Sequence, residues 1–90
     1  MNANGSTLNS VDLEELVEIE LSTTMTFLVV ARDDRSAGKV AAANREELSA
    51  HRAYQEALNL FRVLRHYICP SGARRLAIRM KEIDNTMRES

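Results

Sequence analysis

The stretch from Val40 to Ile68 is rich in alanine, and it limits the fold of this chain more than any other segment. Apolar residues recur along it at spacings of three, four and seven, the period of one face of an α-helix. This face consists of Ala43, Ala50, Ala53, Tyr54, Ala57, Phe61, Leu64 and Ile68. Because alanine side chains are small, a neighbouring helix can approach this face closely. The pattern therefore predicts a long helix packed tightly against a helical partner.

Residues 10–35 predict another long helix, which precedes the alanine-rich one. Asn9 or Ser10 can accept a hydrogen bond from the free amide groups at its start, and acidic residues follow where the helix dipole is positive. Its expected core stripe is Leu13, Leu16, Val17, Leu21, Thr24, Phe27, Leu28 and Ala31. We therefore expect this stripe to be the surface that meets the alanine face.

A short break at residues 36–38 separates these two helices. Gly38 can adopt the left-handed backbone conformation that ends a helix, so the chain can reverse direction there. Two helices joined so tightly must lie antiparallel. At about 1.5 Å per residue, each arm of this hairpin spans roughly 40 Å.

A third helix is predicted over residues 72–87, after the break at Cys69-Pro70-Ser71-Gly72. Its apolar face consists of Ala73, Leu76, Met80, Ile83 and Met87. No segment shows the alternation that is typical of strands, and 90 residues suffice for one small domain. We expect an all-α protein in which residues 10–88 form a long antiparallel hairpin, with the third amphipathic helix packed across its open end. Residues 1–9 are polar and small, and are expected to be a disordered tail.

Cysteine content and the apolar run from Leu21 to Ala31 bear on the compartment. Cys69 is the sole cysteine, so an intrachain disulfide is impossible and a reducing compartment is expected. The apolar run is preceded by glutamates, whereas a signal peptide needs a positive region there. It is also too short to span a bilayer. These features predict a cytoplasmic protein without a transmembrane segment.

Part of the hairpin has a spacing that resembles one tetratricopeptide repeat. Phe27, Val30 and Ala31 precede Gly38 as aromatic, aliphatic and small residues, and Ala50, Tyr54, Ala57 and Leu58 follow in a small–aromatic–small pattern. Between Gly38 and Ala50 this chain has about two helical turns more than the repeat. Because the insertion is close to a whole number of turns, the small and aromatic residues stay on the same helix face. The three-helix layout also resembles, more faintly, the microtubule-interacting-and-transport domain. Either resemblance implies a protein-binding module and no catalytic residue.

Ionisable residues show no spacing typical of catalysis or metal binding. His66 and Cys69 are close enough to face one metal ion, but zinc needs two further ligands and none lies nearby in the sequence. The three glycines are scattered, so a phosphate-binding loop is not expected. We therefore expect no catalytic residue, no cofactor and no metal site.

Several aliphatic residues lie off the predicted core stripes, and they form the candidate interaction surface. These residues are Ile19, Val29, Val30, Leu60 and Val63. Single aliphatic residues are common on protein surfaces, so isolated exposure and a second contact surface both remain open. The leading hypothesis is a non-enzymatic protein–protein interaction or oligomerisation module. Its partner is unknown, and a homo-oligomer is the expected assembly.

The distribution of charge suggests an alternative function. Residues 1–50 contain nine acidic and four basic side chains, whereas residues 51–90 contain four acidic and eight basic ones. The basic patch consists of Arg62, Arg65, Arg74, Arg75, Arg79 and Lys81. It suggests charge-driven binding of nucleic acid or an anionic membrane through the basic C-terminal helix. Tyr67 is the only aromatic residue among the basic ones, within residues 62–81, so a base-stacking platform is missing and nucleic acid is the less favoured partner.

Overall fold

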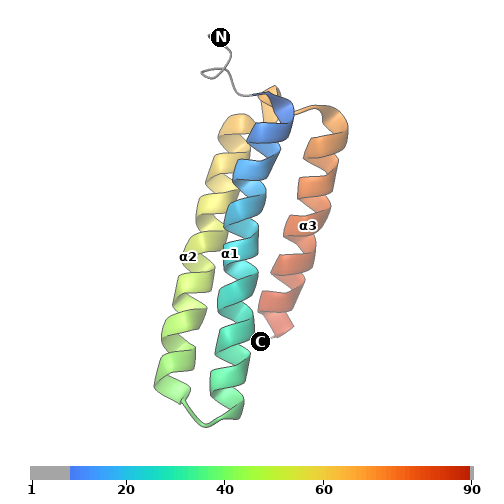
Figure 1. Cartoon of the computed structure of the whole chain (residues 1–90). Coiled ribbons are helices and arrows are strands. Elements are labelled where there is room, and N and C mark those ends of the chain that lie inside the picture. The colour runs from blue at the N-terminus through green and yellow to red at the C-terminus, as the bar shows by residue number, and fades with distance from the viewer. Residues whose placement is uncertain (1–8, 90) are drawn as a thin grey trace.

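The computed structural model describes residues 9–89, and these residues form three long helices without any strand (Figure 1). Helix α1 spans Ser10–Ser36, α2 spans Val40–Leu64 and α3 spans Pro70–Glu89; a short 3₁₀ helix, η2, covers Arg65–Tyr67 between the last two. The predicted all-α fold with a long antiparallel hairpin and a third helix is therefore confirmed. The disordered tail expected at residues 1–9 lies outside the described residues, apart from Asn9.

The ends of the hairpin helices follow the chemistry of their terminal residues. Asn9 caps α1, since its Oδ1 accepts a hydrogen bond of 3.0 Å from the Asp12 amide. The Asn9 amide donates in return to Asp12 Oδ2 at 3.4 Å, which completes a capping box. At the other end Gly38 has a φ of 82°, the left-handed conformation that glycine adopts without strain. The helix start predicted at Asn9 or Ser10 and the chain reversal predicted at Gly38 are therefore both confirmed.

The hairpin is held together by the alanine face of α2. Ala43, Ala50, Ala53 and Ala57 are all buried. The opposing α1 side chains that are buried are Leu13, Val17, Leu21, Thr24, Leu28 and Ala31. The buried Thr24 hydroxyl donates to the Glu20 carbonyl oxygen at 3.0 Å, so no donor is lost in the core. Leu16 departs from the predicted stripe, because 40% of it is exposed at the edge of the contact.

Helix α3 lies alongside α1, and not across the open end of the hairpin as expected (Figure 1). Two ion pairs join α1 to α3: Arg75 bonds Glu14 at 3.0 Å, and Arg79 bonds Glu18 at 3.1 Å. Both pairs are separated by 61 residues, so the two helices run parallel in one register. The physical reason is the length of the apolar face of α3. An end-on position would cover only part of it, whereas α1 offers an apolar wall several turns long.

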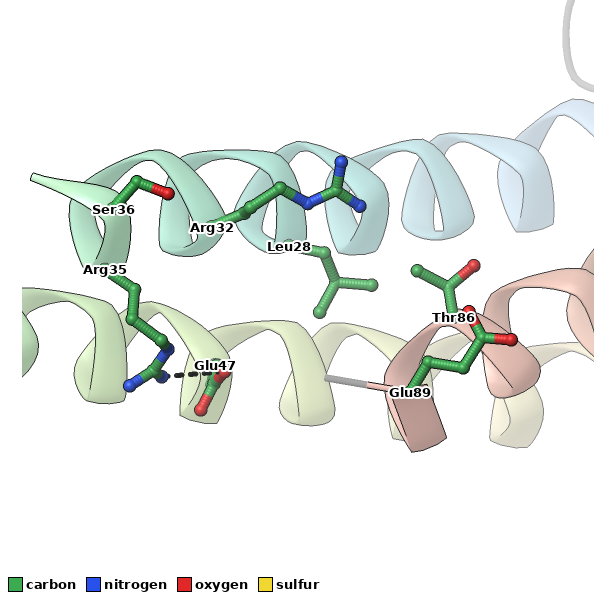
Figure 2. Close-up of a pocket in the computed structure, with 7 residues that line it drawn as sticks. All are labelled: Leu28, Arg32, Arg35, Ser36, Glu47, Thr86 and Glu89. Atoms are coloured by element: carbon green, nitrogen blue, oxygen red, sulfur yellow. Dashed lines mark ion pairs between the residues drawn. The ribbon is translucent and has the colours of Figure 1, made fainter.

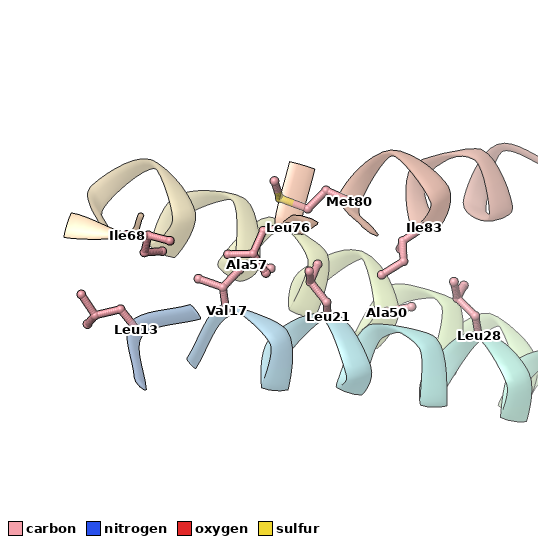
Figure 3. Close-up of a cluster of buried hydrophobic side chains, with 10 residues drawn as sticks. All are labelled: Leu13, Val17, Leu21, Leu28, Ala50, Ala57, Ile68, Leu76, Met80 and Ile83. Atoms are coloured by element: carbon pink, nitrogen blue, oxygen red, sulfur yellow. The ribbon is translucent and has the colours of Figure 1, made fainter. Parts of the chain in front are cut away.

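Apolar side chains of all three helices form the core, in which α3 packs against the apolar side of α1 (Figure 3). Leu76 and Ile83 of α3 point toward the row of α1 side chains that includes Val17 and Leu21. Together with Met80, both α3 residues are buried. Helix α2 also reaches α3, since the Tyr54 hydroxyl donates to the Met80 carbonyl oxygen at 3.2 Å. The buried side chains of successive α3 turns therefore belong to one continuous core.

The connection between α2 and α3 differs from the prediction in its boundaries. Helix α2 gives way to η2 before Ile68, which takes an extended conformation and is buried. Helix α3 begins at Pro70, since proline suits the first position of a helix. A Cβ atom on the buried Gly72 would lie 2.6 Å from Glu14 Oε1 and 3.1 Å from Ile68 Cγ2, so the glycine leaves room for the Glu14 side chain over the first turn of α3.

Overfilling the alanine contact tests whether it holds the hairpin. We expect Ala50→Leu to destabilise the chain by about 1–3 kcal/mol, because the added carbons have no space between α1 and α2. For a chain of this size that lowers Tm by roughly 5–20 °C in a thermal melt followed by circular dichroism. Ala41→Leu is the matched control, since Ala41 is exposed on the same helix. Equal melting temperatures for the two variants would contradict close packing at Ala50.

Candidate interaction surface

The side of α1 that neither α2 nor α3 covers is exposed and carries no charge along its centre. From Leu21 to Ala31 the chain contains no ionisable residue. We define the outer face of α1 as Ile19, Ser22, Thr23, Thr26, Val29 and Val30, all of which are exposed. The exposed fractions of Ile19, Val29 and Val30 are 58%, 47% and 39%. The face is therefore a strip of aliphatic and hydroxyl side chains about three turns long.

The hydroxyl groups on the outer face of α1 are already satisfied within the helix. Thr23 donates to the Ile19 carbonyl oxygen at 2.9 Å, and Thr26 donates to the Ser22 carbonyl oxygen at 3.0 Å. Ser22 itself donates to Glu18 Oε2 at 3.1 Å. A buried donor without a partner is costly, and these donors would all keep a partner if the face were covered. Covering this face would therefore leave none of these hydroxyl donors without a hydrogen-bond partner.

The residues predicted to form the interaction surface are only partly brought together. Ile19, Val29 and Val30 share the outer face of α1. Val63 is 66% exposed, but it lies on α2 near the open end of the hairpin. Leu60 is the exception: it is half-buried and packs against the core, because it follows Ala57 by one helical turn at the edge of the alanine face.

Thr23 and Thr26 belong to the outer face, although the surface predicted from the sequence contained only aliphatic residues. A threonine inside a helix can return its hydroxyl to the carbonyl four residues earlier, which is the signal that would have identified them. The aliphatic residues Leu48 and Ile78 are also exposed, although neither belongs to the surface predicted from the sequence. Ile78 lies on α3, outside the outer face of α1.

The basic patch is partly consumed by pairing inside the chain. Arg75 and Arg79 are the partners of Glu14 and Glu18 on α1. Arg65 lies over the Phe61 ring, 5.9 Å from its centroid. The other members, Arg62, Arg74 and Lys81, are exposed and form no ion pair within residues 9–89. The α3 surface therefore offers fewer free cations than its sequence suggests.

A pocket of about 430 Å³ lies near the tip of the hairpin, beside the C-terminal end of α3 (Figure 2). It is lined by Leu28, Arg32, Arg35, Ser36, Glu47, Thr86 and Glu89. The pocket arises because α3 ends near Leu28, while the hairpin continues for about two further turns. Arg35 is tied across it to Glu47 at 2.8 Å. Its walls hold guanidinium, carboxylate and hydroxyl groups, and no cysteine or histidine nucleophile.

Two carboxyl groups meet where the hairpin arms approach its turn. Glu46 on α2 is half-buried, and its Oε1 is shielded from solvent without a hydrogen-bond partner. Burial raises the pKa of Glu46 above its ordinary value, and the neighbouring Asp34 carboxyl raises it further. The positive charges of Arg45 and Lys39 act in the opposite direction. This part of the hairpin therefore contains a like-charge contact that is unfavourable when both groups ionise.

Cys69 is exposed directly before α3 and is surrounded by hydrogen-bonding groups. Its Sγ lies 3.4 Å from Ser71 Oγ, and its amide donates to Ser10 Oγ at 2.8 Å. The hydrogen bond with Ser71, then those with Ser10 and the Gly72 backbone, lower the pKa of the Cys69 thiol to about 7. Within residues 9–89, no three His, Cys, Asp or Glu side chains are grouped so that they could hold a metal ion.

No protein-family model, no curated protein and no solved structure matches this chain. None of the helices formed by residues 9–89 is both long enough and apolar enough to cross a lipid bilayer.

Replacing Glu46 tests the like-charge contact in the hairpin. A raised folded-state pKa stabilises the fold only while the group is protonated, and this contribution is lost as pH rises through that pKa. We therefore expect Glu46→Gln to raise Tm at pH 7, with the gain vanishing near pH 4. Glu47→Gln is the neighbouring control and should show no gain, because it removes the pairing with Arg35. A lower Tm for Glu46→Gln at pH 7 would show that the ionised Glu46, half-buried beside Asp34, does not destabilise the fold.

The chemistry around Cys69 predicts an unusually reactive thiol. We expect the alkylation rate by iodoacetamide to rise with pH about a midpoint near 7 in the folded chain. In urea the midpoint should return to the ordinary cysteine value of about 8.5. Ser71→Ala should move the folded midpoint upward, because the thiolate loses its main hydrogen-bond donor. An identical midpoint in folded and unfolded chains would show that the surrounding groups do not act on the thiol.

Proposed function

We propose that this chain is a non-enzymatic protein–protein interaction or oligomerisation module that binds helices through the outer face of α1. One observation carries the proposal: an uncharged, β-branched face is exposed on the helix that lies between the other two. Single exposed aliphatic residues are ordinary. Here Ile19, Val29 and Val30 share one face with two threonines, and the face is continuous over several turns.

The β-branched residues of this face lower the stability of α1, and packing within the chain does not offset that loss. Ile19, Thr23, Thr26, Val29 and Val30 are all β-branched. Each lowers helix stability by roughly half a kcal/mol relative to alanine, because the branch restricts χ1 against the preceding turn. An exposed face without a partner would favour charged or unbranched residues instead. Contact with a second surface would supply the missing gain, since burying the exposed half of such an aliphatic side chain contributes roughly 1 kcal/mol, about half the value for full burial.

The manner of binding proposed here is helix-on-helix packing. Exposed side chains spaced by three and four form ridges that fit the grooves of another helix. β-Branched side chains also have few rotamers to lose when they are covered. The tetratricopeptide-like spacing stays a prediction, and it is typical of the same class of function. We further propose a cytoplasmic location, because an exposed reactive thiol such as Cys69 suits a reducing compartment.

Charge-driven binding through α3 is the second candidate. The exposed Arg62, Arg74 and Lys81 favour it. The ion pairs of Arg75 and Arg79 with α1 reduce it, since those two cations are already neutralised at close range. Binding of this kind should weaken steeply with salt, with a slope that reflects the number of phosphates contacted.

Site-specific crosslinking tests the proposed function. We expect benzoylphenylalanine at Val29 to crosslink, in the native host, to one discrete protein or to a second copy of the chain. The purified partner should then bind the unmodified chain, and Thr26→Lys should weaken that binding by about tenfold or more, because a charge enters the centre of the contact. Benzoylphenylalanine at Ile78 is the control, since Ile78 is 55% exposed outside this face. Equal crosslinking from both positions, or none from Val29, would reject the proposal.

A further inference from the structure

We infer that the outer face of α1 binds a basic amphipathic helix of a partner protein. This inference rests on the proposed function and names the chemistry of the partner. It follows from three properties of α1: its net charge, the position of its unpaired carboxylates, and the way in which it already binds α3.

Helix α1 is the acidic element of the chain. Ser10–Ser36 contains seven acidic and two basic residues. Glu14 and Glu18 are neutralised by α3, and Arg35 is paired with Glu47 of α2. Glu15 and Asp33 are both exposed and form no ion pair within residues 9–89, and the same holds for Arg32, which lines the pocket at the end of α3 and not the outer face. The uncovered surface of α1 therefore combines an uncharged centre with free carboxylates.

These two carboxylates bound the outer face at its opposite ends. Glu15 and Asp33 lie on opposite sides of Ile19 and Val30 in the sequence, and they are separated by about five full helical turns. An integral number of turns returns a side chain to the same side of a helix, so both point in the direction of the outer face. The distance along the axis is about 27 Å. A complementary helix would need an aliphatic stripe with Lys or Arg near each end.

Helix α1 already binds one helix of this kind on another side. Helix α3 presents Leu76 and Met80 to the core, and it places Arg75 and Arg79 on acidic residues of α1. The apolar residues supply buried area, and the arginines select the parallel register. The outer face has the same two features, namely exposed aliphatic residues and carboxylates. Glu15 and Asp33 could pair with cations of a partner as Glu14 and Glu18 pair with α3.

The same charges disfavour the other occupants. A second α1 would place Glu15 or Asp33 of one copy near the acidic ends of the other in either orientation. Such like-charge contacts are unfavourable when water is excluded. An anionic membrane would be repelled for the same reason. Electrostatic complementarity therefore selects a cationic partner for this face.

Labelled helical peptides of about 20 residues, long enough to span the face, test this inference. The panel shares one Leu/Ile stripe, and its flanking positions carry Lys and Arg, Glu, or Gln. Fluorescence anisotropy with the full chain should show about tenfold or tighter binding of the basic peptides over the acidic ones. The difference should shrink as salt is raised, because the carboxylates are exposed.

A charge swap provides the decisive variant. We expect the double variant Glu15→Lys and Asp33→Lys to reverse the preference, so that the acidic peptides bind more tightly than the basic ones. The matched control is Glu56→Lys with Glu82→Lys, which makes the same change in net charge at exposed positions on α2 and α3. This control should keep the preference for basic peptides. Circular dichroism verifies that each variant retains its helices.

Several outcomes would overturn the inference. Equal binding of acidic and basic peptides would do so, and so would a reversal of preference in the control variant. Binding by no member of the panel also overturns it, as does self-association through this face that basic peptides fail to compete. The proposed function is judged separately, because crosslinking from Val29 to a non-basic partner or to a second copy would preserve the module and remove only the basic helix.

Discussion

The close contact between α1 and the alanine face of α2 is the constraint on which the rest of the structure depends. Alanine side chains at Ala43, Ala50, Ala53 and Ala57 let two long helices approach over most of their length. A small chain buries a limited fraction of its surface on folding, so a close contact along the full length of two helices is an effective way to bury apolar area. The larger residues stand on α1 and point between the helices. That arrangement makes α1 the wall against which α3 packs.

Helix α1 consequently has three different sides, two of which are covered by the other helices. One side meets small residues of α2, and a second meets the aliphatic face and the arginines of α3. The third side combines β-branched residues with free carboxylates and is uncovered. A helix that is uncharged nearly all round along its centre is normally buried. The low polarity of α1 between Leu21 and Ala31 is therefore explained on two sides by the fold and on the third by the proposed partner.

Secondary features of the molecule follow from the same geometry. The pocket exists because α3 is shorter than the hairpin arms and leaves their distal turns uncovered. The contact between Asp34 and Glu46 exists because the arms converge toward a tight turn at Gly38. The properties of Cys69 arise where the chain turns into α3 beside Ser10 at the start of α1. Each feature lies at an end of the hairpin, whereas the outer face occupies the middle of α1.

Local pattern in the sequence by itself determined the helices, their turn and most of the core. Helical period selected Leu13, Val17, Leu21, Leu28 and the four alanines, and glycine chemistry located the reversal at Gly38. These signals are local, because each depends on residues within one or two turns of one another. Three of the predicted surface residues, Ile19, Val29 and Val30, were identified in the same way.

Tertiary structure alone decided where α3 lies and which charges remain free. Arg75 and Arg79 meet carboxylates 61 residues away, and no periodicity reports a distance of that kind. The same packing withdrew them from the basic patch and left Glu15 and Asp33 unpaired. The contact between α1 and α2 covered Leu60 in part. The physical reason is that amphipathic period states which face of a helix is buried, but not which neighbour covers it. That choice depends on the lengths, register and charges of all three helices together.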